Sequence, residues 1–190
     1  MKTIFRHELK YIITENEYNK LVPIIGKKIP PSNYYKSHIE SIYYDTEDHK
    51  YTKINLDSSI YKEKFRIRFY NNVHNRVVEY KRKYNGRSYK NRIKDIPKNL
   101  KPFCRIGYDR ISYETPDNKI RITFDKNIKG RLIRSTEEIP LLDENLYIME
   151  VKVLYNVPYW LSKELSKYEI YPQKYSKFKS FCKTVESVNK

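Results

Sequence analysis

The sequence predicts an α+β fold, in which an antiparallel eight-stranded β-barrel carries flanking helices in its N- and C-terminal parts. Eight segments are expected to form strands, and five of them alternate between apolar and polar residues with the period of two that is typical of strands, namely 4–13, 63–72, 75–84, 119–126 and 146–154. Their polar positions hold mostly Arg, Lys and Glu, strand after strand. Because like charges that neighbour one another on a sheet face repel, we expect these faces to surround an anion inside the barrel.

The expected strands are separated by recognisable turns. In chain order they lie at about 4–13, 37–44, 63–72, 75–84, 86–93, 105–114, 119–126 and 146–154. Asparagines at 71, 72 and 75 favour a hairpin between the third and fourth strands. Asn85-Gly86 can adopt positive φ and predicts a second hairpin. The segment from Thr115 to Asn118 predicts a third turn.

Helices are expected at both ends of this series. Thr14 and Glu17 form a capping box that predicts a helix to about Ile25, before Gly26 and the Pro30-Pro31 pair. Asp45 and the acidic residues after it favour capping of a short helical stretch. Pro158 suits the first turn of a helix through about Lys167. Ser176 is expected to cap a last helix whose apolar residues recur at helical spacing, namely Phe178, Phe181, Cys182 and Val185. With no internal repeat or linker, residues 1–190 are expected to form one domain.

The composition limits the kinds of ligand and the location that we expect for this protein. The formal net charge of +16 attracts polyanions, namely nucleic acid, acidic membranes or phosphate-rich small molecules. The chain has only four glycines and no Gly-rich phosphate-binding motif, so side chains would have to hold any phosphate. It has no apolar run long enough to span a membrane and no signal-peptide core, and Cys104 and Cys182 form no spaced motif. We therefore expect a cytoplasmic protein.

Period-two placement favours an enclosed phosphate chain over the other polyanions. On 63–72, Phe65, Ile67 and Phe69 share one face, while Lys64, Arg66 and Arg68 share the other. On 146–154, Glu150 and Lys152 oppose an apolar face. The simpler interpretation of each single strand is a sheet with one wet face. Arg66 and Arg68 beside other basic strands are better explained if an anion lies between them.

Short motifs along nearly the whole chain resemble the VTC catalytic domain, the polyphosphate polymerase domain of the CYTH-like triphosphate tunnel metalloenzymes. The matching pieces occur in this order: Phe5-Arg-His-Glu-Leu-Lys10-Tyr, Ser41-Ile-Tyr-Tyr-Asp45-Thr, Lys64-Phe-Arg66-Ile-Arg68, Glu79-Tyr-Lys81, Tyr89-Lys90, Tyr108-Asp-Arg110, Ile120-Arg121-Ile-Thr-Phe-Asp125, Met149-Glu150-Val-Lys152 and Tyr175-Ser176-Lys177-Phe178. The first strand departs from the double-glutamate pattern of the hydrolytic tunnel enzymes, because it reads Glu8-Leu-Lys10.

The resemblance implies a metal-dependent polymerase that transfers the γ-phosphate of ATP or another NTP onto inorganic polyphosphate inside a basic tunnel. It implies catalytic residues around the transferred phosphate, namely Arg66, Arg68, Lys81, Arg110 and Arg121. It implies further phosphate-binding residues, namely Lys10, Lys90, Lys152, Lys177, Tyr108 and Ser176. Mn²⁺ or Mg²⁺ would be held by Glu150, although an ion pair between Glu150 and a neighbouring base explains that residue equally well.

Two other functions remain open at this stage. One is a hydrolase of triphosphate or nucleoside triphosphate with the same fold, and the other is a non-catalytic module that binds polyphosphate. We expect no nucleic-acid partner, because the ordered basic residues alternate within strands instead of lying between aromatic ones. Regulation and chain translocation would need separate partners, membrane proteins among them. The sequence leaves the oligomeric state open.

Overall fold

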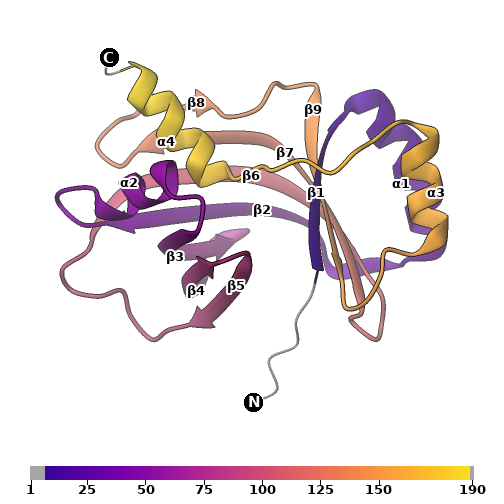
Figure 1. Ribbon diagram of the computed structural model, residues 1–190, viewed down its shortest axis with the longest axis horizontal. Helices are drawn as coiled ribbons and strands as arrows, with labels where there is room; N and C mark the ends of the chain where they lie inside the picture. The colour runs from indigo at the N-terminus through magenta and orange to yellow at the C-terminus, as the bar shows by residue number, and fades with distance from the viewer. Residues whose placement is uncertain (1–6, 189–190) are drawn as a thin grey trace. The chain divides into compact units, whose positions relative to one another are not determined.

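The computed structural model describes residues 7–188, apart from the side chains of 72–75 and 188. Figure 1 shows its helices and strands. The strands are β1 (His7–Thr14), β2 (Pro31–Asp45), β3 (Tyr61–Tyr70), β4 (Asn72–Tyr84), β5 (Arg87–Arg92), β6 (Lys101–Glu114), β7 (Ile120–Leu132), β8 (Ile139–Pro140) and β9 (Leu146–Val153). The helices are α1 (Glu15–Lys28), α2 (Lys50–Asp57), α3 (Tyr159–Lys167) and α4 (Lys177–Val188).

Hydrogen bonds join the strands in the order β1-β9-β7-β6-β2-β3-β4-β5, and β8 pairs with β7. The pairs β1–β9, β9–β7, β2–β3, β3–β4, β4–β5 and β7–β8 are all antiparallel. The expected fold class, antiparallel strands with flanking helices, is confirmed. The strand number rises from eight to nine because two residues of the 129–145 segment pair with β7.

The chain forms two compact units, each built from three separate segments. Unit 1 contains residues 1–37, 109–127 and 142–175. Unit 2 contains residues 38–108, 128–141 and 176–190. Strands β2, β6 and β7 contribute residues to both units.

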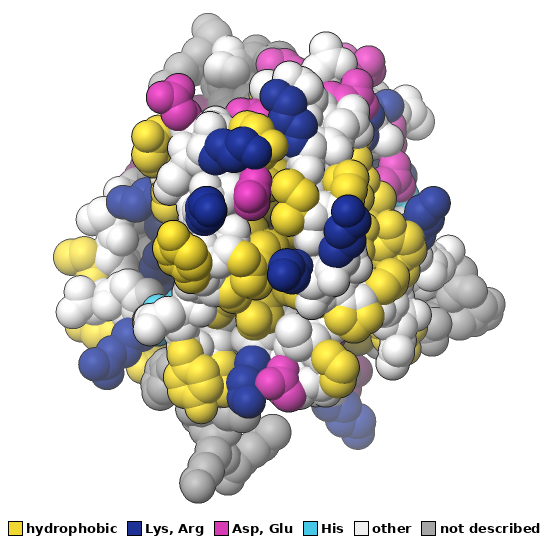
Figure 2. Space-filling model, turned by 90° about the vertical axis from the view of Figure 1, so that its right-hand side faces the viewer, with side chains coloured by type: hydrophobic (Ala, Val, Ile, Leu, Met, Phe, Trp, Pro, Cys, Tyr) yellow, Lys and Arg dark blue, Asp and Glu magenta, His cyan; other side chains and the backbone are white. Residues whose placement is uncertain are grey.

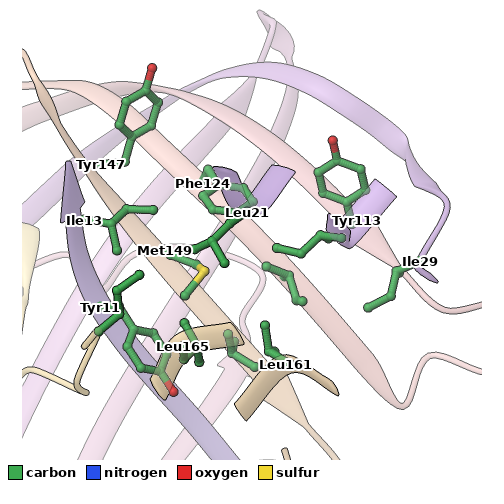
Figure 3. Packing of buried hydrophobic residues seen from close by; sticks show 14 of the residues in the cluster. Tyr11, Ile13, Leu21, Ile29, Tyr113, Phe124, Tyr147, Met149, Leu161 and Leu165 are labelled. Atoms are coloured by element: carbon green, nitrogen blue, oxygen red, sulfur yellow. The ribbon is translucent and has the colours of Figure 1, made fainter. Parts of the chain in front are cut away.

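Unit 1 packs the apolar faces of its strands against α1 and α3. Figure 3 shows Met149 of β9 and Phe124 of β7 beside Leu21 of α1 and Leu161 of α3. These four side chains are at most 1% exposed and belong to one buried cluster. The expected alternation is confirmed here, because Met149, Val151 and Val153 are buried. Burial of such side chains is the main stabilising contribution to this unit.

The capping box at the start of α1 is confirmed. The Glu17 N–H donates to Thr14 Oγ1 at 3.3 Å, and the Thr14 N–H donates to Glu17 Oε2 at 2.6 Å. The helix continues beyond the expected end at Ile25 and reaches Lys28. Its C-cap, Ile29, donates its N–H to the Ile25 carbonyl at 2.8 Å.

Unit 2 places α2 and α4 near the β2–β5 strands. Asp45 at the end of β2 is 1% exposed, and it accepts the N–H groups of Tyr51 and Thr52 at 2.9 and 2.8 Å. These are orphan donors in the first turn of α2, so the expected capping role of Asp45 is confirmed. On α4, Phe178, Phe181 and Cys182 are buried, as their helical spacing predicts.

Several boundaries differ from the sequence prediction. β2 begins at Pro31, so the Pro30-Pro31 pair both follows the first helix and starts a strand. Proline is tolerated as the first residue of a strand, although it has no N–H to donate to a neighbouring strand. β7 continues six residues past the expected end at 126, to Leu132. The expected strand at 4–13 is described from His7 onward, and its residues 4–6 lie outside the described part.

Ser176 caps α4, because its Oγ accepts the Lys179 N–H at 3.3 Å.

Gly130 of β7 tests the packing of unit 2. A Cβ at this position would lie 2.6 Å from Cδ2 of Phe181, whose side chain is fully buried. We expect Gly130→Ala to lower the free energy of unfolding by about 1–3 kcal/mol, as overpacking does. Gly107→Ala is the matched control, because its Cβ would meet no atom closer than 3.7 Å. Urea unfolding of both variants checks this, and equal stabilities would contradict the described packing.

Candidate functional site

The predicted site residues fall into two groups, one in each unit. Unit 2 contains Arg66, Arg68, Lys81, Lys90, Tyr108, Ser176 and Lys177. Unit 1 contains Lys10, Arg110, Arg121, Glu150 and Lys152. Each group is brought together by strand register, as the next paragraphs describe.

The unit 2 group lies on one face of β3, β4 and β5, which we call the basic face. Registers pair Lys62 with Lys83, Lys64 with Lys81 and Arg66 with Glu79. Across the next strand, Lys81 pairs with Lys90 and Glu79 with Arg92. Because alternate residues of a strand share a face, the basic face comprises Lys62, Lys64, Arg66, Arg68, Glu79, Lys81, Lys83, Lys90 and Arg92. Glu79 is its only acid among the described residues.

Glu79 is buried at the centre of this face. Its carboxylate is 2% exposed and accepts from Arg66 Nε at 2.7 Å and from Arg66 Nη2 at 2.6 Å. Lys90 Nζ forms an ion pair with its other oxygen. Burial by itself would raise the pKa of Glu79, but the charges of Arg66, Arg68 and Lys90 outweigh burial and lower the pKa to about 2. Glu79 is therefore ionised at neutral pH and holds two of the predicted phosphate ligands in place.

The two arginines of β3 have further partners on β2. Arg66 Nη1 donates to the Tyr43 hydroxyl at 3.2 Å, and the guanidinium lies 5.9 Å from the Tyr43 ring centre. Burial alone would lower the pKa of Arg66. Its neighbours Tyr43, Glu79 and Tyr108 outweigh burial and raise the pKa above its ordinary value. Arg68 Nε donates to Ser41 Oγ at 3.3 Å. These contacts hold both guanidinium groups on the basic face, and Arg66 is fixed more tightly than Arg68.

The start of α4 supplies the remaining unit 2 residues. Lys64 Nζ donates to Ser176 Oγ at 2.9 Å and lies 5.1 Å from the Phe178 ring centre. Lys177 Nζ lies 4.3 Å from the ring centre of Tyr108, which is 2% exposed. The Ser176 hydroxyl accepts both hydrogen bonds described for it, so its own proton can be donated to a ligand. The predicted roles of Ser176, Lys177 and Tyr108 in phosphate binding stay predictions.

The unit 1 group contains a closed ring of four ion pairs, which we call the charged ring. Register places Glu8 opposite Lys152 and Lys10 opposite Glu150. The four Nζ–O distances are 3.2 Å for Lys10–Glu8, 3.6 Å for Lys10–Glu150, 3.7 Å for Lys152–Glu8 and 2.6 Å for Lys152–Glu150. Glu150 is thus an ion-pair residue in this structure.

Neighbouring charges shift the pKa values of two ring members, Glu150 and Lys10. Burial would raise the pKa of Glu150, but Lys152, Lys10 and Arg110 hold it well below its usual range. Burial would lower the pKa of Lys10, and the charges of Glu150 and Glu8 raise it instead. Glu150 and Lys10 therefore both stay ionised at neutral pH.

Strand β7 adds basic and hydroxyl groups beside the ring. Arg121 lies opposite Lys152, and Thr123 lies opposite Glu150. Arg121 Nε and Thr123 Oγ1 are buried and have no hydrogen-bond partner. Arg110 binds Asp125 through two hydrogen bonds, at 2.6 and 2.8 Å, and Asp125 is 1% exposed. Arg121 Nε is thus left without a hydrogen-bond partner, whereas two nitrogens of Arg110 are committed to Asp125.

The charged ring also offers the donors that a divalent metal prefers. No group of three or more His, Cys, Asp or Glu side chains within the described residues could hold a metal ion on its own. Glu8 and Glu150 supply two carboxylates on one face. Mg²⁺ is usually bound by one or two protein carboxylates together with substrate phosphates, so these residues fit a metal that arrives with a phosphate substrate.

Sequence reasoning missed the acids that organise both groups. Glu79, Asp125 and Glu8 each bind one or two of the predicted basic ligands. The available signal was the alternation Glu79-Tyr-Lys81, in which one acid stands on an otherwise basic face. The pattern could not show that Glu79 is buried, because burial depends on the neighbouring strands.

The arrangement suits binding and electrostatic stabilisation of phosphates more than nucleophilic catalysis. Arg and Lys side chains bind phosphate oxygens well. Cys104 and Cys182 are buried, and burial raises the pKa of both thiols, that of Cys182 to about 11. Neither thiol is therefore a thiolate at neutral pH, and both fit the expected role of small core residues.

On one side of unit 1 the basic side chains form no rows. Figure 2 shows the side of unit 1 that carries α1 and α3, where Lys and Arg are scattered among hydrophobic, uncharged and a few acidic side chains. In the described part of the chain, no helix is both long enough and apolar enough to cross a membrane.

The comparisons with known proteins agree with this fold. No curated protein matches the sequence. Among solved structures, PH1819 from Pyrococcus horikoshii has a TM-score of 0.58 at 16% identity, covering 96% of this chain and 99% of its own. A putative adenylate cyclase from Vibrio parahaemolyticus has a TM-score of 0.56 at 12% identity, covering 95% and 99%. The putative adenylyl cyclase HpAC1 from Hippeastrum has a TM-score of 0.53 at 12% identity, covering 92% and 93%.

These structures share the fold with this chain. The sequence also matches the family model of the VTC domain over residues 5–99 and 95–187. That match covers nearly the whole chain and confirms the resemblance carried by its short motifs, so the protein belongs to the VTC domain family.

Proposed function

We propose that the protein is a polyphosphate polymerase that transfers the γ-phosphoryl group of ATP or another NTP onto inorganic polyphosphate. The basic face carries this proposal, because eight basic side chains share it with one buried, ionised acid. Such a face attracts most strongly a ligand that carries many negative charges in a small volume. Membership of the VTC domain family supports the same substrate class.

Each group contributes phosphate-binding side chains in this proposal. In unit 2, Arg66 and Lys90 are held by Glu79 and bind phosphate oxygens, and Arg68 and Lys81 add charge on the same face. In unit 1, Arg121 binds through its unpartnered Nε, while Lys10 and Lys152 turn from the glutamates toward phosphate. Prepositioned positive charge of this kind lowers the barrier to phosphoryl transfer.

No side-chain nucleophile is needed for this chemistry. A terminal oxygen of the polyphosphate forms a bond to the γ-phosphorus, and the bond from that phosphorus to the β–γ bridging oxygen breaks. ADP, or the corresponding nucleoside diphosphate, leaves with that electron pair, and the chain becomes one phosphate longer. The protein's residues position both anions and offset their mutual repulsion.

The proposal includes Mn²⁺ or Mg²⁺ held by Glu150, with Glu8 beside it. A divalent ion, when bound, neutralises charge on the transferred phosphoryl group and its leaving oxygen. Lys10 and Lys152 form ion pairs with Glu150 in the structure, so the glutamate would hold the metal only if these lysines turned to phosphate.

A hydrolase is the second candidate. The similar structure of HpAC1 is described as having a dominant triphosphatase activity, at 12% identity. On this chain, hydrolysis would require only that a water molecule take the place of the terminal polyphosphate oxygen. The polymerase and the hydrolase share the same phosphate-binding residues and differ in the acceptor. We further propose a cytoplasmic location, with separate partners for regulation.

Incubation with ATP and Mn²⁺ tests the reaction. We expect ADP and long-chain polyphosphate on a gel, and no turnover when the metal is chelated. Arg66→Ala should lower kcat/KM by about 100-fold or more, because an electrostatic contact to the transferred group is lost. Arg76→Ala on the opposite face of β4 is the matched control and should keep full activity.

The possible products separate the candidates. ADP with only free phosphate would contradict the polymerase and support the hydrolase. Tight polyphosphate binding without turnover would support a non-catalytic module. Glu150→Gln should raise the Mn²⁺ concentration needed for half-maximal activity, and an unchanged metal requirement would make Glu150 an ion-pair residue alone.

The ionised state of Glu79 predicts a pH dependence of stability. Its pKa falls from 4.5 to about 2 on folding, so its contribution is fully present above pH 4.5 and is lost as the pH falls through 2. This depression corresponds to roughly 3 kcal/mol. The stability difference between wild type and Glu79→Gln should therefore shrink as the pH falls from 6 to 3. Urea unfolding measures it, and a difference independent of pH would show that Glu79 is not the titrating group.

A further inference from the structure

The side of β3, β4 and β5 that is opposite the basic face interleaves aromatic and basic side chains. Register places Tyr61 opposite Tyr84, and Tyr84 opposite Arg87. In the next row, Arg82 lies opposite Tyr89. We call the four residues Arg82, Tyr84, Arg87 and Tyr89 the tyrosine–arginine patch. All of them belong to unit 2, and none has a role in the proposed reaction.

The patch is accessible to solvent. Tyr84 is 57% exposed, Arg82 and Arg87 are exposed, and Tyr89 is half-buried. A single exposed tyrosine is ordinary on a protein surface. Two tyrosines and two arginines that neighbouring strands bring together form a denser arrangement, which we interpret as a binding surface.

Internal contacts occupy the rest of this side of the sheet. The Phe65 ring centre lies 5.2 Å from that of Tyr51 on α2 and 4.7 Å from that of Tyr80. The hydroxyls of Tyr61 and Tyr80 both donate to the Glu63 carboxylate. Glu63 is the only acid on this side of the three strands among their described residues. The neighbours of the patch are thus engaged with one another.

The two arginines keep their charge for an external anion. Neither Arg82 nor Arg87 forms an ion pair within the described residues. The Arg82 guanidinium lies 5.3 Å from the Tyr89 ring centre, and such a contact with a ring does not neutralise the charge. A phosphate group could therefore bind either arginine without displacing an acid.

Stacking surfaces beside positive charge favour single-stranded nucleic acid over other polyanions. Its bases stack on aromatic rings of a sheet, and basic side chains bind its phosphates. Tyr84 and Tyr89 are diagonal neighbours on β4 and β5, and such neighbours lie about 7–8 Å apart. This spacing is roughly twice the rise of about 3.4 Å between stacked bases. Inorganic polyphosphate has no flat group, so it would gain from the arginines alone.

Alternation of basic residues within single strands predicts no nucleic-acid partner. The patch differs, because its tyrosines and arginines are interleaved between two strands as well as along them. The register of β4 with β5 places Arg82 opposite Tyr89 and Tyr84 opposite Arg87. Only that register reveals the arrangement.

We infer that the tyrosine–arginine patch binds single-stranded nucleic acid. Bases stack on Tyr84 and Tyr89, and phosphates bind Arg82 and Arg87. The patch lies on the opposite side of the strands from the basic face, so this inference does not depend on the polymerase or hydrolase reaction.

The test compares two fluorescently labelled probes of equal length and charge, an oligothymidylate and an abasic oligonucleotide. Fluorescence anisotropy should show that wild type binds the oligothymidylate at least tenfold more tightly, because only this probe has bases to stack. The double variant Tyr84→Ser, Tyr89→Ser leaves the protein's charge unchanged. It should lose this preference and keep its affinity for the abasic probe. Tyr84→Phe, Tyr89→Phe retains both rings and should retain the preference.

A charge variant and a matched control complete the test. Arg82→Gln, Arg87→Gln should weaken the binding of both probes. The slope of log affinity against log salt concentration should become shallower by about 1.4, or about 0.7 for each phosphate contact that is lost. The control is Tyr155→Ser, Tyr171→Ser, which changes two tyrosines of unit 1 that are 68% and 67% exposed. It should leave both affinities unchanged.

Three results would overturn the inference. Equal affinity of wild type for the two probes would show that bases contribute nothing. A preference for oligothymidylate that persists in the serine double variant would place base binding elsewhere on the chain. An equal loss in the unit 1 control would remove the special role of the patch. If the double variant does not fold, Tyr84→Ser alone, at a position that is 57% exposed, gives the same comparison.

Discussion

The ion pairs of the buried Glu79 with Arg66 and Lys90 are the interaction on which the basic face depends. Without an acid at its centre, three strands would place eight positive side chains on one surface, and β3 and β4 would repel each other. Taking the charges of Glu79 and Arg66 out of water is costly, and loss of one partner from such a buried pair typically costs about 3–5 kcal/mol. Glu79 thus stabilises the face while leaving it strongly positive, which is the condition that a phosphate ligand requires.

The charged ring of unit 1 differs from the basic face because it has no excess of positive charge. Its two lysines and two glutamates balance, so the ring by itself carries no net charge. Positive charge at this location comes from β7 and β6, through Arg121 and Arg110. Arg110 is largely satisfied by Asp125, whereas Arg121 keeps a buried nitrogen without a partner. In the proposed reaction, Glu150 of this balanced ring would bind the metal once Lys10 and Lys152 had turned to phosphate.

The sequence predicted much of this because strand faces depend only on alternation. The capping box of α1, the buried face of β9 and the joint placement of Arg66, Arg68 and Lys81 all follow from local periodicity. Glu79 and Asp125 could not be recognised as partners of the arginines, since their burial and pairing depend on the register between strands. The sequence also did not predict the extension of β7 to Leu132 or the short strand β8, because both are defined by pairing between distant segments.

A crystal structure of the protein with inorganic tripolyphosphate would test most directly that the basic face binds phosphate. We expect phosphate oxygens within hydrogen-bonding distance of Arg66 and Lys90, with the Arg66–Glu79 ion pair retained. Tripolyphosphate bound only at scattered surface lysines, with the basic face empty, would contradict the account.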